Sequence, residues 1–179
     1  MNPTIVTPGS QTPQASRLRR KVVIGIGEFA VSEEGQDLIV THALGSCVAV
    51  CLYDPVARVG GMIHILLPDS KINPARADVQ PAAFADTGIP MLFHAAYERG
   101  AKKARCRVHL VGGAAVSGMP TTAASVGKRN VLAARQILWR NGVLVEKEEV
   151  GGTTARNVSL DVGDGTVQFS NALIGVTVL

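Results

Sequence analysis

A cysteine and a histidine, seventeen residues apart, have the residue types of a nucleophile and its base. Cys47 ends the segment Thr41-His42-Ala43-Leu44-Gly45-Ser46-Cys47, and His64 follows inside an apolar segment. The thiolate attacks carbonyl carbons, whereas a free cysteine, with a pKa near ~8.5, is mostly protonated at neutral pH. A neighbouring imidazole can stabilise the thiolate as an ion pair and later protonate a leaving amine. The pair therefore predicts a cysteine hydrolase.

The two residues before Cys47 are suited to holding a negatively charged oxygen. Gly45 and Ser46 supply flexible backbone, and a glycine lets the chain approach a ligand closely. Amide N–H groups in such a turn can point at the oxygen that becomes negative when a carbonyl is attacked. We expect Gly45 and Ser46 to contribute backbone oxyanion donors.

Two predicted strands can bring the cysteine and the histidine together. Alternation predicts strands over Cys47–Tyr53 and Val59–Leu67, separated by the turn Asp54-Pro55. If they pair as a hairpin, the start of one approaches the end of the other, and Cys47 comes close to His64. Thr41 lies in the turn before Cys47, where its residue type alone fits a β-favouring residue at a strand end.

The remaining pattern predicts an α/β or α+β layered sandwich, with mixed sheets flanked by two main helices. One helix is predicted from an N-cap at Thr87 to Gly100, and the other over Ser125–Asn141 with Trp139 in or near the core. A loop is predicted over Lys71–Asp86. Further strands are predicted over Val22–Ile26, Leu38–Val40, Arg105–Val111, Val143–Val145, Val158–Val162, Thr166–Phe169 and Leu173–Val178. A regular βαβ alternation is absent, which argues against a doubly wound nucleotide fold.

Composition narrows the class of protein. The 179 residues suit a single domain, and we expect a disordered leader over 1–20 followed by one domain over 21–179. The net charge is +4 with only 4% aromatic residues, so nucleic-acid binding is not expected. No run of about 18 apolar residues predicts membrane insertion. Three cysteines, an odd number, fit a reduced, cytoplasmic setting.

Several candidate residues also have ordinary structural interpretations. A cysteine in a valine-rich strand is often a small buried hydrophobe, and an imidazole in an apolar strand is often a satisfied core side chain. Arg129 and Asn130, inside a predicted helix, fit a tie between helix and loop better than substrate contact. A zinc site could be drawn from His42, Cys47, Cys51 and His64, but no Cys-x-x-Cys pair is present. We therefore expect neither a metal nor another cofactor.

The order and spacing of several motifs resemble one known family. The sequence is similar to the CheD family, the chemoreceptor glutamine deamidases of bacterial chemotaxis. The likeness rests on Thr41-x-x-Leu44-Gly45-Ser46-Cys47-Val48, Gly61-x-x-His64-x-x-Leu67-Pro68, Ala85-Asp86-Thr87-x-x-Pro90, Gly100-Ala101, Gly112-Gly113-Ala114, Val126-Gly127-x-Arg129-Asn130 and Gly151-Gly152-x-x-x-Arg156.

The resemblance implies hydrolysis of glutamine side chains on chemoreceptors to glutamates, with release of ammonia. By position, Cys47 would be the nucleophile, His64 its base and Thr41 the group that orients the imidazole. The family also resembles toxin glutaminase domains of the cytotoxic necrotizing factor type, and its members are bound by a CheC phosphatase. Departures are His109-Leu110-Val111 before Gly112 and Ala155 where a glycine is usual. These departures from the family pattern are expected to affect receptor specificity more than the catalytic chemistry.

Two other functions stay open. A non-catalytic module could keep the fold and bind a CheC-like phosphatase or receptor tails. Alternatively, the same residues could serve another cysteine hydrolase, such as a glutamate methylesterase or a small-amide hydrolase. Release of methanol in place of ammonia would identify the methylesterase.

Overall fold

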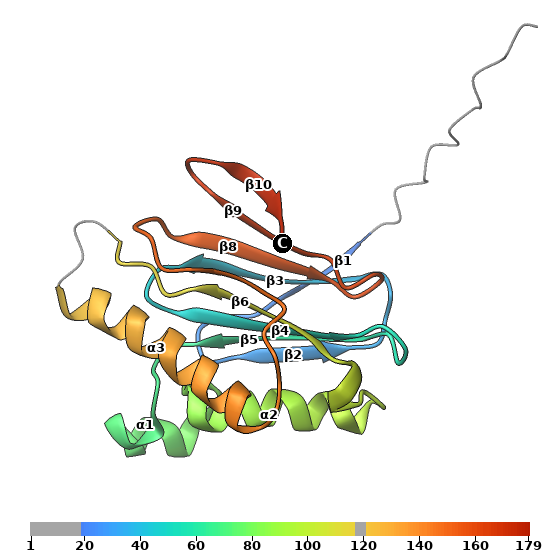
Figure 1. Ribbon diagram of the computed structural model, residues 1–179, viewed down its shortest axis with the longest axis horizontal. Coiled ribbons are helices and arrows are strands. Elements are labelled where there is room, and N and C mark those ends of the chain that lie inside the picture. Colours follow the sequence, from blue (N-terminus) through green and yellow to red (C-terminus); the bar gives the residue numbers. More distant parts are fainter. Residues whose placement is uncertain (1–18, 117–120) are drawn as a thin grey trace, which may run out of the picture.

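The computed structural model describes residues 19–116 and 121–179, and within them the strands form two five-stranded sheets packed face to face (Figure 1). The first sheet has the strand order β1-β3-β8-β9-β10. Its strands are β1 (Arg20–Val23), β3 (Asp37–Leu44), β8 (Arg156–Asp161), β9 (Val167–Asn171) and β10 (Gly175–Val178).

The second sheet lies in the middle of the molecule and has the order β2-β5-β4-β6-β7. Its strands are β2 (Phe29–Ser32), β5 (Val59–Ile65), β4 (Val48–Asp54), β6 (Arg107–Gly112) and β7 (Lys147–Val150). Parallel pairing of β1 with β3 and of β6 with β7, beside antiparallel pairs elsewhere, makes both sheets mixed.

The main helices α2 (Ala85–Glu98) and α3 (Thr121–Arg140) cover the face of the second sheet that points away from the first (Figure 1). The layers are therefore sheet, sheet and helices, which confirms the predicted mixed, layered α+β architecture. Shorter elements are η1 (Ser70–Ile72), α1 (Pro74–Val79), η2 (Pro81–Ala83) and η3 (Lys103–Arg105). Among the described helices, none combines the length and hydropathy needed to cross a bilayer.

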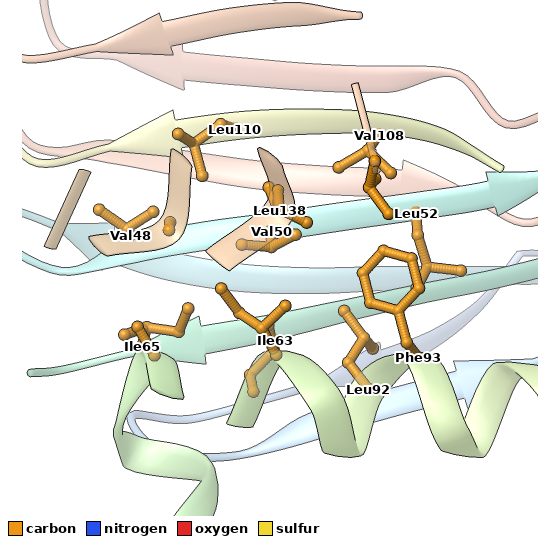
Figure 2. Packing of buried hydrophobic residues seen from close by; sticks show 14 of the residues in the cluster. Val48, Val50, Leu52, Ile63, Ile65, Leu92, Phe93, Val108, Leu110 and Leu138 are labelled. Carbon is orange, nitrogen blue, oxygen red and sulfur yellow. The ribbon is translucent and has the colours of Figure 1, made fainter. Parts of the chain in front are cut away.

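Strand β4 separates two hydrophobic clusters because its alternate side chains face opposite layers. Val48, Val50 and Leu52 join a cluster with the helices, where they pack near Leu92 and Leu138 (Figure 2). Cys47, Ala49 and Cys51 belong instead to the cluster between the two sheets, together with Ile39, Met62, Val111 and Leu160. Burial on both faces explains why β4 reads as a continuous apolar run.

Four local predictions are wrong. The stretch 71–86 is not a plain loop, since it contains α1 and η2, with Asn73 capping α1 and Pro74 in its first turn. Helix α2 begins before Thr87, whose hydroxyl donates to the Pro81 carbonyl from inside the helix. Trp139 is 74% exposed, on the outer side of α3. No strand covers 143–145, and β7 begins at Lys147.

The segment before Cys47 also differs from its prediction. Thr41 lies within β3, which runs on to Leu44, so the turn comprises only the residues between Leu44 and Val48. A bulge between Thr41 and Leu44 accommodates Ala43, which has a positive φ of 56°. Residues 1–18 of the expected leader lie outside the described residues.

Candidate active site

Cys47 and His64 lie on neighbouring strands and on the same face of the second sheet. Strands β4 and β5 pair as an antiparallel hairpin, with Ala49 opposite His64 and Val48 opposite Ile65. Continuing this register by one pair places Cys47 opposite Leu66, so His64 is its diagonal neighbour on the side facing the first sheet. Such diagonal neighbours are roughly 7–8 Å apart. The predicted hairpin is confirmed, and it is what brings these two segments together.

The His64 ring is held by a hydrogen-bond chain that crosses between the sheets. Thr41 Oγ1 lies 2.9 Å from the Ile24 carbonyl oxygen, to which it donates, and 2.7 Å from His64 Nδ1. Because the hydroxyl has one proton and gives it to Ile24, Nδ1–H must donate to Thr41. This tautomer leaves Nε2 without a proton, and no described residue is a hydrogen-bond partner for Nε2. His64 therefore presents an unused basic lone pair.

Burial opposes charge on both candidate groups. It raises the pKa of the Cys47 thiol to about 11, an effect that the nearby positive charge of Arg76 reduces. Burial also lowers the pKa of His64 to about 4. At neutral pH the thiol and the imidazole are both neutral, so the thiolate–imidazolium pair expected from the sequence is not the resting form. A nucleophilic role for Cys47 would therefore require the thiol to lose its proton as the sulfur attacks.

The sulfur and the ring do not form a hydrogen bond with each other in this structure. Catalytic hydrogen bonds are often longer without substrate and tighten in the complex. Cys47 keeps 7% of its surface exposed, whereas Cys51, four residues further along the chain and on the same face of the strand, is fully buried. Of these two buried cysteines, Cys47 is the one with part of its surface exposed.

Three successive backbone carbonyl groups of the turn before β4 accept hydrogen bonds. The Gly45 oxygen accepts from the Ala114 N–H at 2.7 Å, and the Cys47 oxygen accepts from the Gly113 N–H at 2.7 Å. The Ser46 oxygen accepts from Asn130 Nδ2 at 2.9 Å. In contrast, no acceptor within the described ranges receives the N–H groups of residues 45–47. These N–H groups have no acceptor among the described residues, and the oxyanion role of the Gly45 and Ser46 backbone stays a prediction.

The Gly112-Gly113 pair makes this arrangement possible. Gly112 has a φ of 116°, and a Cβ atom there would clash with the Cys47 carbonyl oxygen. Gly113 has a φ of 67°, in the left-handed region that glycine favours. The sequence analysis assigned this pair no role beyond its place in the Gly112-Gly113-Ala114 motif, and that motif was the signal that could have linked it to Cys47.

The groove between the two main helices is not at the candidate active site. A groove of about 540 Å³ lies between α2 and α3 and is lined by side chains that include Phe93, Tyr97 and Leu138. These helices cover the opposite face of the second sheet from Cys47. The candidate chemistry therefore rests on the side-chain arrangement between the two sheets.

Comparison with known protein families matches residues 66–171, more than half of the chain, to a family described as CheD chemotactic sensory transduction. This chain belongs to the CheD family. The matched residues begin just after His64, so they include Asn130 and Gly113 but neither Cys47 nor His64. The wider similarity to individual members covers more of the chain.

Two relatives illustrate that coverage. A Solibacter usitatus (strain Ellin6076) protein, named probable chemoreceptor glutamine deamidase CheD, is 44% identical over 145 residues, 81% of this chain and 85% of its own. A Pyrococcus abyssi (strain GE5 / Orsay) protein of the same name is 35% identical over 159 residues, 88% of this chain and 96% of its own. Among solved structures, the Bacillus licheniformis hypothetical protein YfiH aligns with a TM-score of 0.43 and 14% identity, over 76% of this chain and 61% of its own.

Proposed function

We propose that this CheD family member is a protein-glutamine deamidase that converts glutamines of chemoreceptors to glutamates. The observation that carries the proposal is the Thr41–His64 pair, which leaves Nε2 unprotonated on the strand beside Cys47. A core histidine with a purely structural role would be expected to satisfy both ring nitrogens. The names of the relatives supply the substrate class.

The proposed reaction starts from the neutral pair. His64 Nε2 takes the proton of the Cys47 thiol as the sulfur attacks the carboxamide carbon of a glutamine, and N–H groups of residues 45–47 bind the oxyanion. The imidazolium then protonates the leaving nitrogen, the C–N bond breaks, and ammonia departs from a thioester. His64 next takes a proton from a water that attacks the thioester. Collapse of that intermediate expels the sulfur, which recovers its proton from His64, and leaves glutamate.

The finer partners belong to the same proposal. Chemoreceptors are the macromolecular substrates, and the family resemblance suggests a CheC-like phosphatase as a regulatory partner. Three cysteines without disulfide bonds are compatible with a reducing cytoplasm. We also propose a relation to the glutaminase domains of cytotoxic necrotizing factor toxins, supported by a cysteine and a histidine on paired strands of a mixed sheet.

A direct test incubates the full chain with a purified receptor cytoplasmic fragment. We expect ammonia release and a mass gain of about 1 Da at each modified glutamine, the latter measured by peptide mass spectrometry. Methanol released from a methylated receptor, without ammonia, would instead indicate a glutamate methylesterase. Receptor binding without either product would indicate a non-catalytic binding module and would overturn the proposed activity.

A further inference from the structure

The geometry points to Asn130 as a positioning residue for the reaction: its side-chain amide holds the turn before Cys47 and the strand end after His64 in one fixed register. This inference rests on the proposed function. Asn130 lies in α3, outside both sheets, and its side chain is fully buried. It therefore connects the helical layer to the site from the face of the second sheet opposite Cys47 and His64.

One amide nitrogen makes both contacts. Asn130 Nδ2 donates to the Ser46 carbonyl oxygen at 2.9 Å and to the Leu66 carbonyl oxygen at 2.9 Å. Ser46 precedes Cys47 by one residue, and Leu66 follows His64 by two. Both carbonyls lie just outside the terminal Val48–Ile65 pair of the β4–β5 ladder, Ser46 before the start of β4 and Leu66 after the end of β5, where the ladder itself no longer fixes the spacing. Asn130 takes over that task for the sulfur and the imidazole.

The contact with Ser46 also sets a direction. In a trans peptide the C=O and the following N–H point opposite ways, and the described part of the chain contains no cis peptide. Anchoring the Ser46 carbonyl toward α3 therefore turns the Cys47 N–H away from α3. That N–H is one of those without an acceptor within the described ranges. Asn130 thus aims a proposed oxyanion donor without touching the substrate.

The oxygen of the Asn130 side-chain amide argues against a purely stabilising role for this residue. Asn130 Oδ1 is buried and has no hydrogen-bond partner among the described residues. An unpaired buried acceptor is unfavourable, and asparagine is a poor residue for a helix interior. The amide orientation is nevertheless fixed, because a flipped amide would set Oδ1 against two carbonyl oxygens. The arrangement favours holding two strand ends together over stabilising the helix.

A double-mutant cycle tests this without a glutamine substrate. The rate of iodoacetamide alkylation at Cys47 is measured by peptide mass spectrometry in the full chain, in H64Q, in N130A and in the double variant. We expect H64Q and N130A each to slow alkylation, and H64Q to have no further effect once Asn130 is gone. The matched control is L138A, a buried α3 variant expected to lower the melting temperature while leaving the H64Q effect intact.

Turnover supplies the second measurement. In the ammonia assay, well below the melting temperatures, N130A should lower kcat by about 100-fold, the loss typical of one oxyanion donor, with KM unchanged. N130D, which places an oxygen against both carbonyls, should be at least as impaired and replaces N130A if the latter does not fold. The inference would be overturned if the effects of H64Q and N130A on the alkylation rate simply multiplied in the double variant. It would also be overturned if the kcat of N130A stayed within twofold of the parent, or if L138A lost as much kcat as N130A. If the parent releases no ammonia but the cycle remains coupled, the proposed function fails and the positioning role stands.

Discussion

Thr41 Oγ1 lies 2.7 Å from His64 Nδ1 and joins the two sheets at the candidate active site. The hydroxyl comes from β3 of one sheet and the ring from β5 of the other. Because Thr41 also donates to the Ile24 carbonyl, it can only accept from His64. The packing of the sheets thereby selects the tautomer in which Nε2 can act as a base.

The first prediction concerns this tautomer. T41V keeps the shape of the side chain but removes the hydroxyl, so Nδ1–H loses its acceptor and the ring is no longer fixed. We expect kcat for ammonia release to fall by about 10- to 100-fold, part of the roughly 10²–10⁴-fold that a positioned general base contributes. KM should stay within about twofold. T41S, which retains the hydroxyl, should keep most of the activity; equal losses in T41V and T41S would contradict the role.

The pH dependence of turnover should report the burial of His64. The base must be unprotonated, and burial lowers its pKa to about 4. We therefore expect kcat/KM to be level from neutral pH down to about 5 and to fall by half near pH 4. Circular dichroism at each pH verifies that the fold persists. A half-loss near the ordinary histidine value of ~6.5 would mean that the ring is solvated in the active enzyme.

The resting state of the nucleophile can be titrated directly. Since burial raises the pKa of the Cys47 thiol to about 11, its alkylation rate should keep rising with pH through 9 and 10. A preformed ion pair would instead give a plateau at or below neutral pH. Cys51 serves as an internal control, because it is fully buried and should react only through unfolding. Equal rates at both cysteines would show that the reagent enters by unfolding.

The fold contributes a separate prediction at Asp54. Burial would raise the pKa of this carboxyl, but hydrogen bonds from Arg105 and from backbone N–H groups outweigh burial and lower the pKa to about 2. Since the unfolded value is near ~3.9, Asp54 stabilises the fold above about pH 4, and this contribution is lost as pH falls toward 2. D54N should lower the free energy of unfolding by about 2–3 kcal/mol at pH 7 and flatten its change over this range.

An exposed ion pair provides the control for D54N. Arg107 and Glu146 are paired at the surface, with side chains 46% and 40% exposed. E146Q should change the free energy of unfolding by less than about 1 kcal/mol. Chemical denaturation of both variants at pH 7 and pH 3 distinguishes the cases. Similar losses in both variants would contradict a special role for the buried carboxyl.

The hairpin was predictable because its signals are local. Alternation, together with the Asp54-Pro55 turn, sets the pairing of β4 with β5 and so the approach of Cys47 to His64. The contacts that complete the site are not local. Thr41 comes from the other sheet and Asn130 from a helix more than 80 residues after Cys47, and no periodicity reports such contacts. Only the motif resemblance drew attention to both positions.

The incorrect predictions also concern properties that depend on tertiary packing and not on local sequence pattern. Alternation cannot reveal that both charged forms are disfavoured, because the pKa values of Cys47 and His64 depend on how completely two sheets exclude water. Trp139 was expected in or near the core on its residue type, yet the α3 face that packs inward carries Val131, Ala134 and Leu138. Tertiary packing decides which side of a helix is buried.

The central claim is that Cys47 is the nucleophile, and comparison of two cysteine variants tests it most directly. C47A and C51A each remove one thiol from the same strand face, 7% and 0% exposed respectively. Both variants are first verified as folded and then assayed for the 1 Da mass gain on receptor glutamines. We predict that C47A abolishes the gain while C51A retains it. Deamidation by C47A at the parent rate would contradict the account.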